Sequence, residues 1–353
     1  MSSYRAPWWL PGGHAQTFYA ALAAPRPRVA YRRERWDTPD GDFIDVDWVV
    51  KPAEVARRFN LTGGKDYAQG PLSNEDPIFE IMEPATVPLV VLFHGLEGSS
   101  RSHYALALMA AVRDAGWRGA VVHFRGCSGE PNRLPRAYHS GDAREIDWIM
   151  RRLRAQHAYA PLFAVGVSLG GNALLKWLGE TAASARDVVE RAASVSAPVD
   201  LMAAGNALDR GFNLVYVRGF LRTLKSKSLE KLTRFPGLYD ADAVRGSRTL
   251  REFDDLVTAP LHGFRNTDDY WTRASSKPGL RNIRVPTFIA NARNDPFLPA
   301  GVLPRAGEVS AVVTLEQPEQ GGHAGFVSGR FPGNLDWLPA RVLEFFGAGA
   351  EKS

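Results

Sequence analysis

The stretch that decides the fold is Leu162-Phe163-Ala164-Val165-Gly166-Val167-Ser168-Leu169-Gly170-Gly171. Its apolar first part, 162–167, predicts a buried strand, and the glycines around Ser168 predict a sharp turn into a helix from Asn172 onward. Small residues are needed two places before and after the serine, because a side chain there would collide with a neighbouring strand or helix. Such a turn presents the serine oxygen at the carboxyl edge of a sheet, beside a helix N-terminus. The stretch therefore predicts a nucleophilic Ser168, with an ordinary serine in a tight turn as the less favoured interpretation.

Similar apolar segments lie on both sides of this stretch and alternate with segments of helical length. The predicted strands are 44–50, 87–93, 119–124, 162–167, 192–196, 286–290 and 312–315, and the predicted helices are 104–115, 143–156, 173–180 and 338–346. Near-continuous apolar strands alternating with helices are typical of a mostly parallel sheet that is covered on both faces. The sequence therefore predicts an α/β protein with a mostly parallel central sheet flanked by helices.

Two stretches interrupt this alternation. Residues 52–86 are polar and rich in Gly, Pro, Asn and Asp, which predicts an excursion between early strands. Residues 203–284 form an insertion between two predicted strands, and insertions of this length without a function are uncommon. We therefore expect a core formed by residues 1–202 and 285–353, with residues 203–284 as a helical lid or cap over the active site.

A serine hydroxyl needs a neighbouring base to take its proton at neutral pH. Only two of the eight histidines, His262 and His323, follow Ser168. In folds with this serine turn, the acid comes next in the chain and the histidine last. His323 lies in a glycine-rich loop after a predicted strand, whereas His262 lies inside the insertion and precedes the best acid. We therefore predict that His323 is the base, with a surface-loop histidine as the alternative.

The acid that orients the base is predicted to be Asp295. It lies in Asn294-Asp295-Pro296, just after the predicted strand 286–290, where the carboxyl edge of the sheet is expected. An Asx turn before proline is the alternative interpretation of this residue. Both its position and its place in the order of the chain favour the catalytic interpretation.

The tetrahedral intermediate formed by such a serine carries a negative oxygen that needs preorganised donors, each contributing roughly 3 kcal/mol. One donor is expected to be the backbone N–H of Leu169, immediately after the nucleophile. The second is expected to be the N–H of Leu96, in the loop His94-Gly95-Leu96-Glu97-Gly98 after the predicted strand 87–93. His94 itself is interpreted as a structural residue that holds this loop.

Small or apolar residues close to these motifs are the candidates for contact with the substrate. We expect Gly95 and Phe326 from the core, and Phe212 and Phe220 from the insertion, to line the substrate pocket. The apolar residues of the insertion should shape a cavity that binds an acyl chain.

The charge of the chain is concentrated in one segment. The 353 residues have a formal net charge of +5, and segment 206–234 carries seven basic residues against two acidic ones. Apolar residues lie between these charges, a mixture compatible with contact with an anionic membrane. We favour a lid whose charged side meets water, with peripheral membrane contact through 206–234 as the alternative.

Other partners and compartments are disfavoured by what the sequence lacks. There is no nucleic-acid-binding motif, no phosphate-binding glycine loop and no metal-binding spacing, so we expect no nucleic acid, cofactor or metal. The apolar runs are shorter than the roughly 20 residues that cross a bilayer, and no secretory signal is seen. The single cysteine, Cys127, excludes an internal disulfide and is interpreted as a small buried residue rather than a nucleophile. We expect a cytoplasmic protein.

The motifs of the chain resemble one branch of the α/β-hydrolase fold, which includes the bacterial YheT-like esterases and the eukaryotic abhydrolase-domain lipases. The similar stretches follow one order over nearly the whole chain and are Trp8–Thr17, His94–Ser100, Phe124–Glu130, Tyr138–Asp142, the turn at Ser168, Phe253–Asp255, Gly263-Phe264, Tyr270, Asn294–Pro296 and Gly322–Phe326. The resemblance implies hydrolysis of carboxylic esters, with Ser168, Asp295 and His323 as the catalytic residues.

The predicted reaction is hydrolysis of short- to medium-chain acyl esters or lipids through an acyl-enzyme intermediate. His323 takes the proton as Ser168 attacks the ester carbonyl, protonates the leaving alcohol, and later activates water. An acyltransferase with the same triad, and a non-catalytic binding protein of this fold, are the alternatives. The sequence predicts neither the physiological substrate nor the oligomeric state.

Overall fold

The computed structural model describes residues 4–50 and 86–347, and its centre is an eight-stranded sheet. The strand order is β1-β2-β4-β3-β5-β6-β7-β8, in which every neighbouring pair from β4 to β8 is parallel. The predicted mostly parallel sheet is confirmed. The bounds are β1 (Ala30–Asp37), β2 (Phe43–Val50), β3 (Leu89–Phe93), β4 (Arg118–His123), β5 (Leu162–Val167), β6 (Arg191–Val195), β7 (Thr287–Ala290) and β8 (Val313–Glu316).

The edge strand β1 was not predicted, because its sequence Ala-Tyr-Arg-Arg-Glu-Arg-Trp-Asp contains no apolar run. It pairs antiparallel with β2, and β2 is antiparallel to β4. Opposite charges face each other across the first pair: Arg33 lies opposite Asp47, and Arg35 opposite Asp45. Each arginine donates two hydrogen bonds to its partner carboxylate. These cross-strand ion pairs replace the apolar contacts that hold the central strands.

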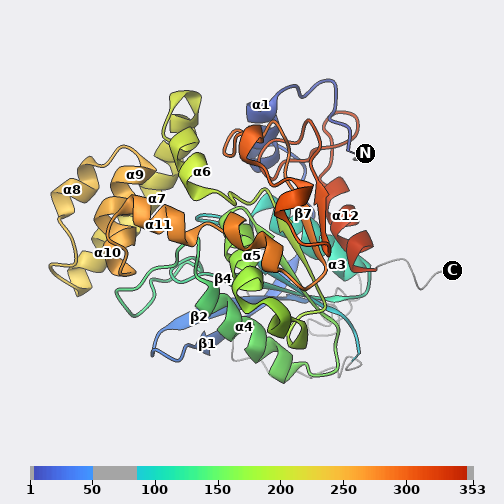
Figure 1. Cartoon of the computed structure of the whole chain (residues 1–353), viewed down its shortest axis with the longest axis horizontal. Helices are drawn as coiled ribbons and strands as arrows, with labels where there is room; N and C mark the ends of the chain where they lie inside the picture. Colours follow the sequence, from blue (N-terminus) through green and yellow to red (C-terminus); the bar gives the residue numbers. More distant parts are fainter. Residues whose placement is uncertain (1–3, 51–85, 348–353) are drawn as a thin grey trace, which may run out of the picture.

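Helices cover both faces of the sheet (Figure 1). Alternate β3 residues point to opposite faces, as strand geometry requires. Leu89, Val91 and Phe93 pack with α4 (Ala143–Gln156) and α5 (Leu169–Thr181). The even-numbered residues of β3 pack on the other face with α3 (His103–Asp114) and α12 (Trp337–Phe346). The core is therefore two apolar layers, one on each side of a buried sheet.

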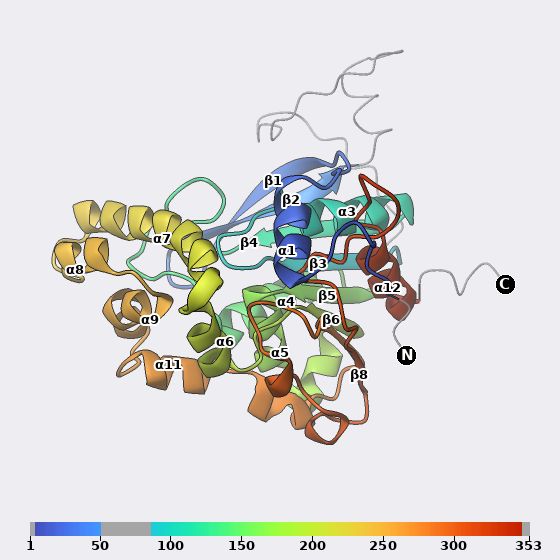
Figure 2. The ribbon, with the colours of Figure 1, turned by 90° about the horizontal axis from the view of Figure 1, so that it is seen from above.

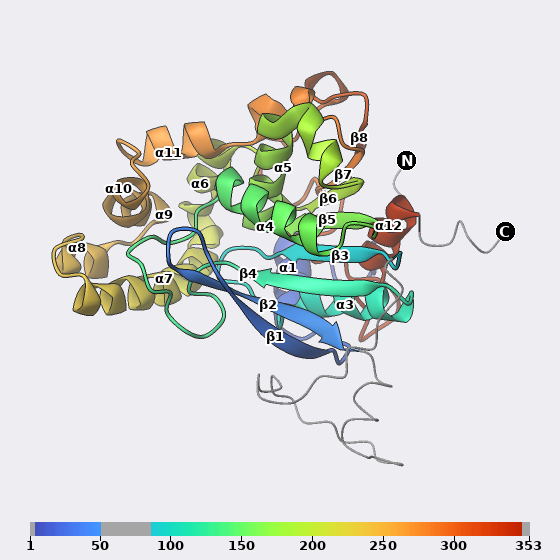
Figure 3. The same cartoon turned by 90° about the horizontal axis from the view of Figure 1, so that it is seen from below.

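The chain between β6 and β7 forms a helical insertion, defined here as residues 201–282. Figures 1 and 2 show it as a separate group of helices at one end of the sheet, and the arrowhead of β4 points toward this group in Figure 3. It has its own apolar core, which includes Val217, Leu221, Phe253 and Trp271. Its helices are α6 (Leu201–Leu208), α7 (Leu214–Arg234), α8 (Ala241–Gly246), α9 (Leu250–Phe253), α10 (Ala259–Leu261) and α11 (Thr267–Ala274), with a π-helical turn at Asp254–Thr258.

Other elements lie near their predicted positions, and two findings differ from the predictions. Helix α5 begins at Leu169, three residues before the start expected at Asn172, because the turn at Ser168 leads directly into it. Helix α1 (Gly13–Leu22) was not predicted. The polar excursion expected at 52–86 lies outside the described residues except for its last position. Within residues 4–50 and 86–347, no helix has both the length and the apolar character needed to span a bilayer.

Candidate active site

The turn between β5 and α5 holds Ser168 in an unusual backbone conformation, with φ 53° and ψ −119°. A non-glycine residue at positive φ costs on the order of 1–3 kcal/mol. The flanking glycines make the turn possible. A Cβ on Gly166 would lie 2.5 Å from the carbonyl oxygen of Gly170, and a Cβ on Gly170 would lie 2.4 Å from the carbonyl oxygen of Phe93 in β3. The predicted collision with a neighbouring strand is thus seen at Gly170.

The structure brings Ser168, His323 and Asp295 together at the carboxyl edge of the sheet. The Nε2 of His323 lies 2.9 Å from the Oγ of Ser168, and its Nδ1 lies 2.9 Å from Oδ2 of Asp295. The Asp295 carboxylate is fully buried, and its Oδ1 accepts the N–H of Phe297 at 2.8 Å. Because a carboxylate only accepts, the Nδ1 of His323 is the donor and Nε2 is left to accept from the serine. The Phe297 ring packs on the imidazole at 4.1 Å between centroids.

Helix α1 holds the loop that carries His323. The N–H of His323 donates to Thr17 Oγ1 at 2.9 Å, and the N–H of Gly321 donates to Gln16 Oε1 at 2.8 Å. The Asn294 side chain joins the two loops, because it donates to Gln16 Oε1 and accepts the N–H of Gly322. Gly13 completes this packing, since a Cβ on it would lie 1.9 Å from the Asn294 carbonyl oxygen. The loops of the acid and of the base are thus positioned by a helix at the other end of the sequence.

Leu96, Leu169 and Ser168 all line one cavity. In the part of the chain that the structure describes, neither the amide of Leu96 nor that of Leu169 donates a hydrogen bond to another protein group. Each amide therefore has an unused N–H, as an oxyanion hole requires. Gly95 comes close as well, since a Cβ on it would lie 3.0 Å from the Cβ of Ser168.

The loop of Leu96 is held by buried aromatic side chains. The N–H of Gly95 donates to the Tyr104 hydroxyl at 2.8 Å. His94 Nδ1 donates to the Gly95 carbonyl, and its Nε2 accepts the N–H of Phe124. Burial lowers the pKa of His94 to about 3, so its ring is neutral and can both donate and accept. These contacts give His94 the structural position that the sequence predicted.

The loop is also tied to the helical insertion. The Lys227 ammonium on α7 forms an ion pair with Glu97, 2.8 Å from Oε2. The Tyr138 hydroxyl accepts the N–H of Glu97 and donates to its Oε1 at 2.8 Å. Burial lowers the pKa of Lys227 and the neighbouring Glu97 carboxylate raises it, and overall the pKa is raised. Glu97 has a φ of 55° and follows Leu96 directly. Sequence reasoning missed Lys227, because no motif surrounds it.

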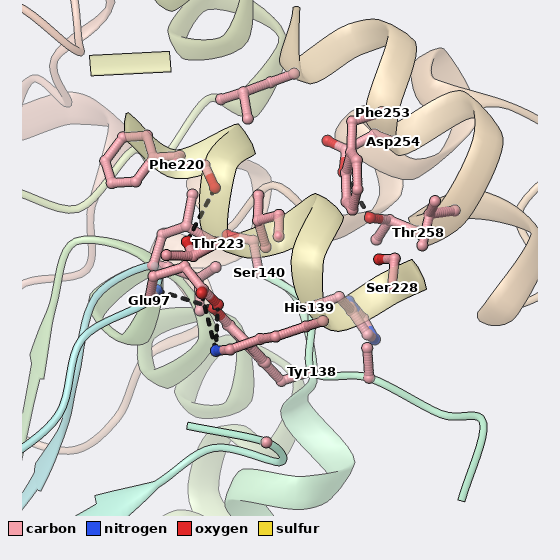
Figure 4. A pocket seen from close by; sticks show the side chains of 18 of the residues that line it. Glu97, Tyr138, His139, Ser140, Phe220, Thr223, Ser228, Phe253, Asp254 and Thr258 are labelled. Carbon is pink, nitrogen blue, oxygen red and sulfur yellow. Dashed lines mark hydrogen bonds and ion pairs between the residues drawn. The ribbon is translucent and has the colours of Figure 1, made fainter. Parts of the chain in front are cut away.

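A cavity of about 530 Å³ extends from Ser168 beneath the insertion. Figure 4 shows Phe220 and Thr223 of α7 on one side, with Phe253, Asp254 and Thr258 opposite them. Much of the lining is apolar and includes Leu96, Leu201, Leu208, Phe220, Leu224, Leu250, Val257, Leu261, Trp271 and Phe297. Such a cavity has the shape and surface for an acyl chain.

Of the four residues predicted to line the pocket, Phe220 lines it, and Gly95 lies close to Ser168 without being among the lining residues. The other two lie elsewhere. Phe326 is fully buried beside Tyr4 and Trp337, because the turn after His323 directs it into the core. Phe212 is 57% exposed and packs edge-on against His14 and Phe18 outside the cavity. Both predictions were wrong.

Cys127 lines the same cavity but is a poor nucleophile. Burial raises the pKa of its thiol to about 12. Only the thiolate is strongly nucleophilic, so this cysteine stays protonated and unreactive at neutral pH.

The chain is similar to known proteins of one family. A family model described as alpha/beta hydrolase fold matches residues 88–329. The chain belongs to the α/β-hydrolase fold family. Its relatives include YheT of Escherichia coli (strain K12), whose esterase activity is assigned rather than established, at 37% identity over 94% of this chain and 89% of YheT. Human phospholipase ABHD3 is 28% identical over 97% of this chain and 78% of its own.

Solved structures of the family share the fold. The Pyrococcus furiosus esterase Pf2001 is 14% identical, with a TM-score of 0.52 over 90% of this chain and 92% of that chain. The predicted α/β-hydrolase fold, and the resemblance to the YheT-like branch, are confirmed.

Proposed function

We propose that this chain, an esterase/lipase-type member of the α/β-hydrolase family, hydrolyses carboxylic esters through a Ser168–His323–Asp295 triad and an acyl-enzyme. The observation that carries the proposal is the pair of 2.9 Å contacts that His323 makes with Ser168 and Asp295. The relatives named as an esterase and a phospholipase support the class of reaction.

In the proposed first step, Ser168 Oγ attacks the ester carbonyl carbon while His323 Nε2 takes the hydroxyl proton. Asp295 stabilises the imidazolium by accepting from Nδ1. The carbonyl oxygen becomes negative and accepts the N–H groups of Leu96 and Leu169, each contributing about 3 kcal/mol. When the intermediate collapses, His323 returns the proton to the leaving alcohol and Ser168 keeps the acyl group.

In the second step, His323 takes a proton from water as the water oxygen attacks the acyl carbon. His323 then returns this proton to Ser168 Oγ as the acyl–Oγ bond breaks, which releases the acid and the free serine. The proposed site for the acyl chain is the apolar cavity beneath α7, with Phe220 in its wall. The helical insertion acts in this scheme as a lid that keeps the bound acyl chain away from water. Short- to medium-chain acyl esters or lipids are the proposed substrates, and the proposed compartment is the cytoplasm, where the single cysteine stays reduced.

Two other functions would use the same fold. An acyltransferase would pass the acyl group to an alcohol or thiol, and competition between such an acceptor and water distinguishes it from a hydrolase. A binding protein would hold the ester without cleaving it. The bonded contacts from serine to histidine to aspartate favour an enzyme over a binding protein.

Peripheral contact with an anionic membrane is proposed for the segment 206–234. Phe212 and Val215 are exposed by 57% and 42% near the start of α7, and Arg210, Arg218 and Arg222 are exposed beside them. Exposed apolar and basic side chains together favour binding at the surface of an anionic bilayer.

The test is hydrolysis of p-nitrophenyl esters, from acetate to palmitate, by the protein and its Ser168→Ala variant. We expect turnover that the variant loses, together with fluorophosphonate labelling of the unchanged protein alone. The preferred chain length would measure the depth of the cavity. If the unchanged protein neither cleaves these esters nor reacts with the probe, the binding-protein function replaces the esterase.

A further inference from the structure

The outer side of α7 borders a second hollow, of about 610 Å³, away from Ser168. It is lined by one face of α7, by Asp209 after α6, and by the segment that joins α8 to α9. The lining residues are Asp209, Leu214, Arg218, Leu221, Arg222, Lys225, Ser247, Arg248 and Thr249. We name this the arginine hollow, because three of its nine lining residues are arginines.

The cations of the arginine hollow are poorly neutralised by the protein. Among the residues that the structure describes, the side chains of Arg218, Arg222 and Arg248 have no carboxylate or carbonyl partner. Lys225 donates to the backbone carbonyls of Arg245 and Ser247. These carbonyls carry no net charge, so the positive charge of Lys225 is not neutralised.

The one carboxylate in this lining already has other partners. Both oxygens of Asp209 accept backbone N–H groups at the start of α9, from Leu250 at 2.8 Å and Arg251 at 3.0 Å. The lining residues therefore carry four cations and one carboxylate, and a second carboxylate, Glu252, lies beside them and accepts the backbone N–H of Arg248. Even with Glu252 counted, the hollow has an excess of positive charge.

Holding these arginines together costs stability when the hollow is empty. Arg218 and Arg222 lie one turn apart on α7, a spacing at which like charges repel. A guanidinium stays charged in a protein, so the repulsion cannot be relieved by losing a proton. Arg234, on the same helix, behaves differently, since it donates to the carbonyls of Asn132 and Arg133. An anion from solution would supply the missing acceptors.

We propose that the arginine hollow binds a phosphate group, presented by an anionic lipid headgroup or by a soluble phosphate monoester. Guanidinium groups match phosphate oxygens with paired N–H donors, and such charge-assisted bonds are roughly twice as strong as neutral ones. Phe212, just before α7, and Val215, in its first turn, are both exposed and precede Arg218 in the sequence, so apolar side chains accompany the cations. This site deepens the proposed membrane contact and is independent of the ester chemistry at Ser168.

The first arm of the test is titration calorimetry with inorganic phosphate, with sodium chloride at matched ionic strength as the reference. We expect saturable binding that weakens roughly tenfold or more in the double variant Arg218→Gln/Arg222→Gln, because two paired donors are lost. The control is Arg144→Gln, an exposed arginine of α4 that is not among the lining residues of the hollow, and it should bind like the unchanged protein. Circular dichroism checks that each variant is folded.

The second arm separates the two sources of phosphate by flotation with vesicles of phosphatidylcholine, alone or mixed with phosphatidic acid. Phosphate binding together with flotation on the acidic vesicles supports the site with a lipid ligand. Phosphate binding without flotation supports the site with a soluble monoester. Absence of phosphate binding, or binding and flotation unchanged in the double variant, overturns the proposal. Both readouts omit an ester substrate, so failure here is distinct from failure of the esterase.

Discussion

The sheet edge and the helical insertion place their charged groups in different ways. At the sheet edge, Asp295 is fully buried and engaged with His323 and a backbone amide. In the insertion, Lys227 points inward to Glu97, while Arg218 and Arg222 point outward without an internal partner. The comparison indicates that the core supplies a fixed chemical site, and that the insertion supplies groups that meet other molecules or reach back to that site.

The largest effect is expected where the fixed arrangement of the core is broken. Asp295→Asn puts an amide beside Nδ1 of His323, which favours the wrong tautomer and removes the acceptor at Nε2. We expect kcat to fall about 10⁴-fold. Steady-state hydrolysis of a p-nitrophenyl ester measures it, with Asp336→Asn, an exposed carboxylate before α12, as the control. A loss below tenfold would show that Asp295 does not orient the base.

A glycine pair tests packing in the two regions. Gly170→Ala places a methyl group 2.4 Å from a β3 carbonyl oxygen, and we expect a loss of about 1–3 kcal/mol in the free energy of unfolding. Gly219→Ala lies inside exposed α7 with no atom within 4 Å, and there we expect a gain of roughly 0.5–1 kcal/mol. Urea denaturation measures both changes. Equal effects of the two substitutions would contradict the comparison.

The insertion contains one buried acid whose titration can be tested. Burial raises the pKa of Asp254 from 3.8 to about 6. The folded protein therefore holds this proton more tightly than the unfolded chain, and stability falls as pH rises from about 4 through 6. The loss is at most about 3 kcal/mol. Urea denaturation across this range should show the protein losing stability relative to Asp254→Asn. If the difference in stability between the two proteins does not change with pH, the pKa of Asp254 is not raised.

The smallest effect is expected where the insertion reaches the core. Lys227→Met removes the ion pair that links α7 to the loop of Leu96, and a donor displaced from its position stabilises the oxyanion less well. We expect kcat to fall about tenfold with KM nearly unchanged. Lys176→Met, which removes a surface pair with Glu180 on α5, is the control. If the effects of Lys227→Met and Glu97→Gln are additive in the double variant, the two side chains act separately.

Much of the site was predictable because each chemical group sits in a short motif at a strand end. The serine turn, Asp295 and His323 follow β5, β7 and β8, and parallel strands bring these ends to one edge. The residues that hold the loops of the site in place were not predictable. Thr17 and Lys227 act through contacts 306 and 130 residues away in the sequence, which no local pattern records. Phe326 was misplaced for the same reason, since a glycine-rich loop does not reveal which way its side chains turn.

The bond between Thr17 and the His323 amide has a consequence for biosynthesis. A ribosome makes the chain from its N-terminus, so α1 emerges hundreds of residues before the loop that it will hold. Ser168 also emerges 155 residues before His323, so the proposed nucleophile is made well before its proposed base. Under the proposed mechanism, the nascent chain therefore cannot attack esters until the two ends of the polypeptide meet.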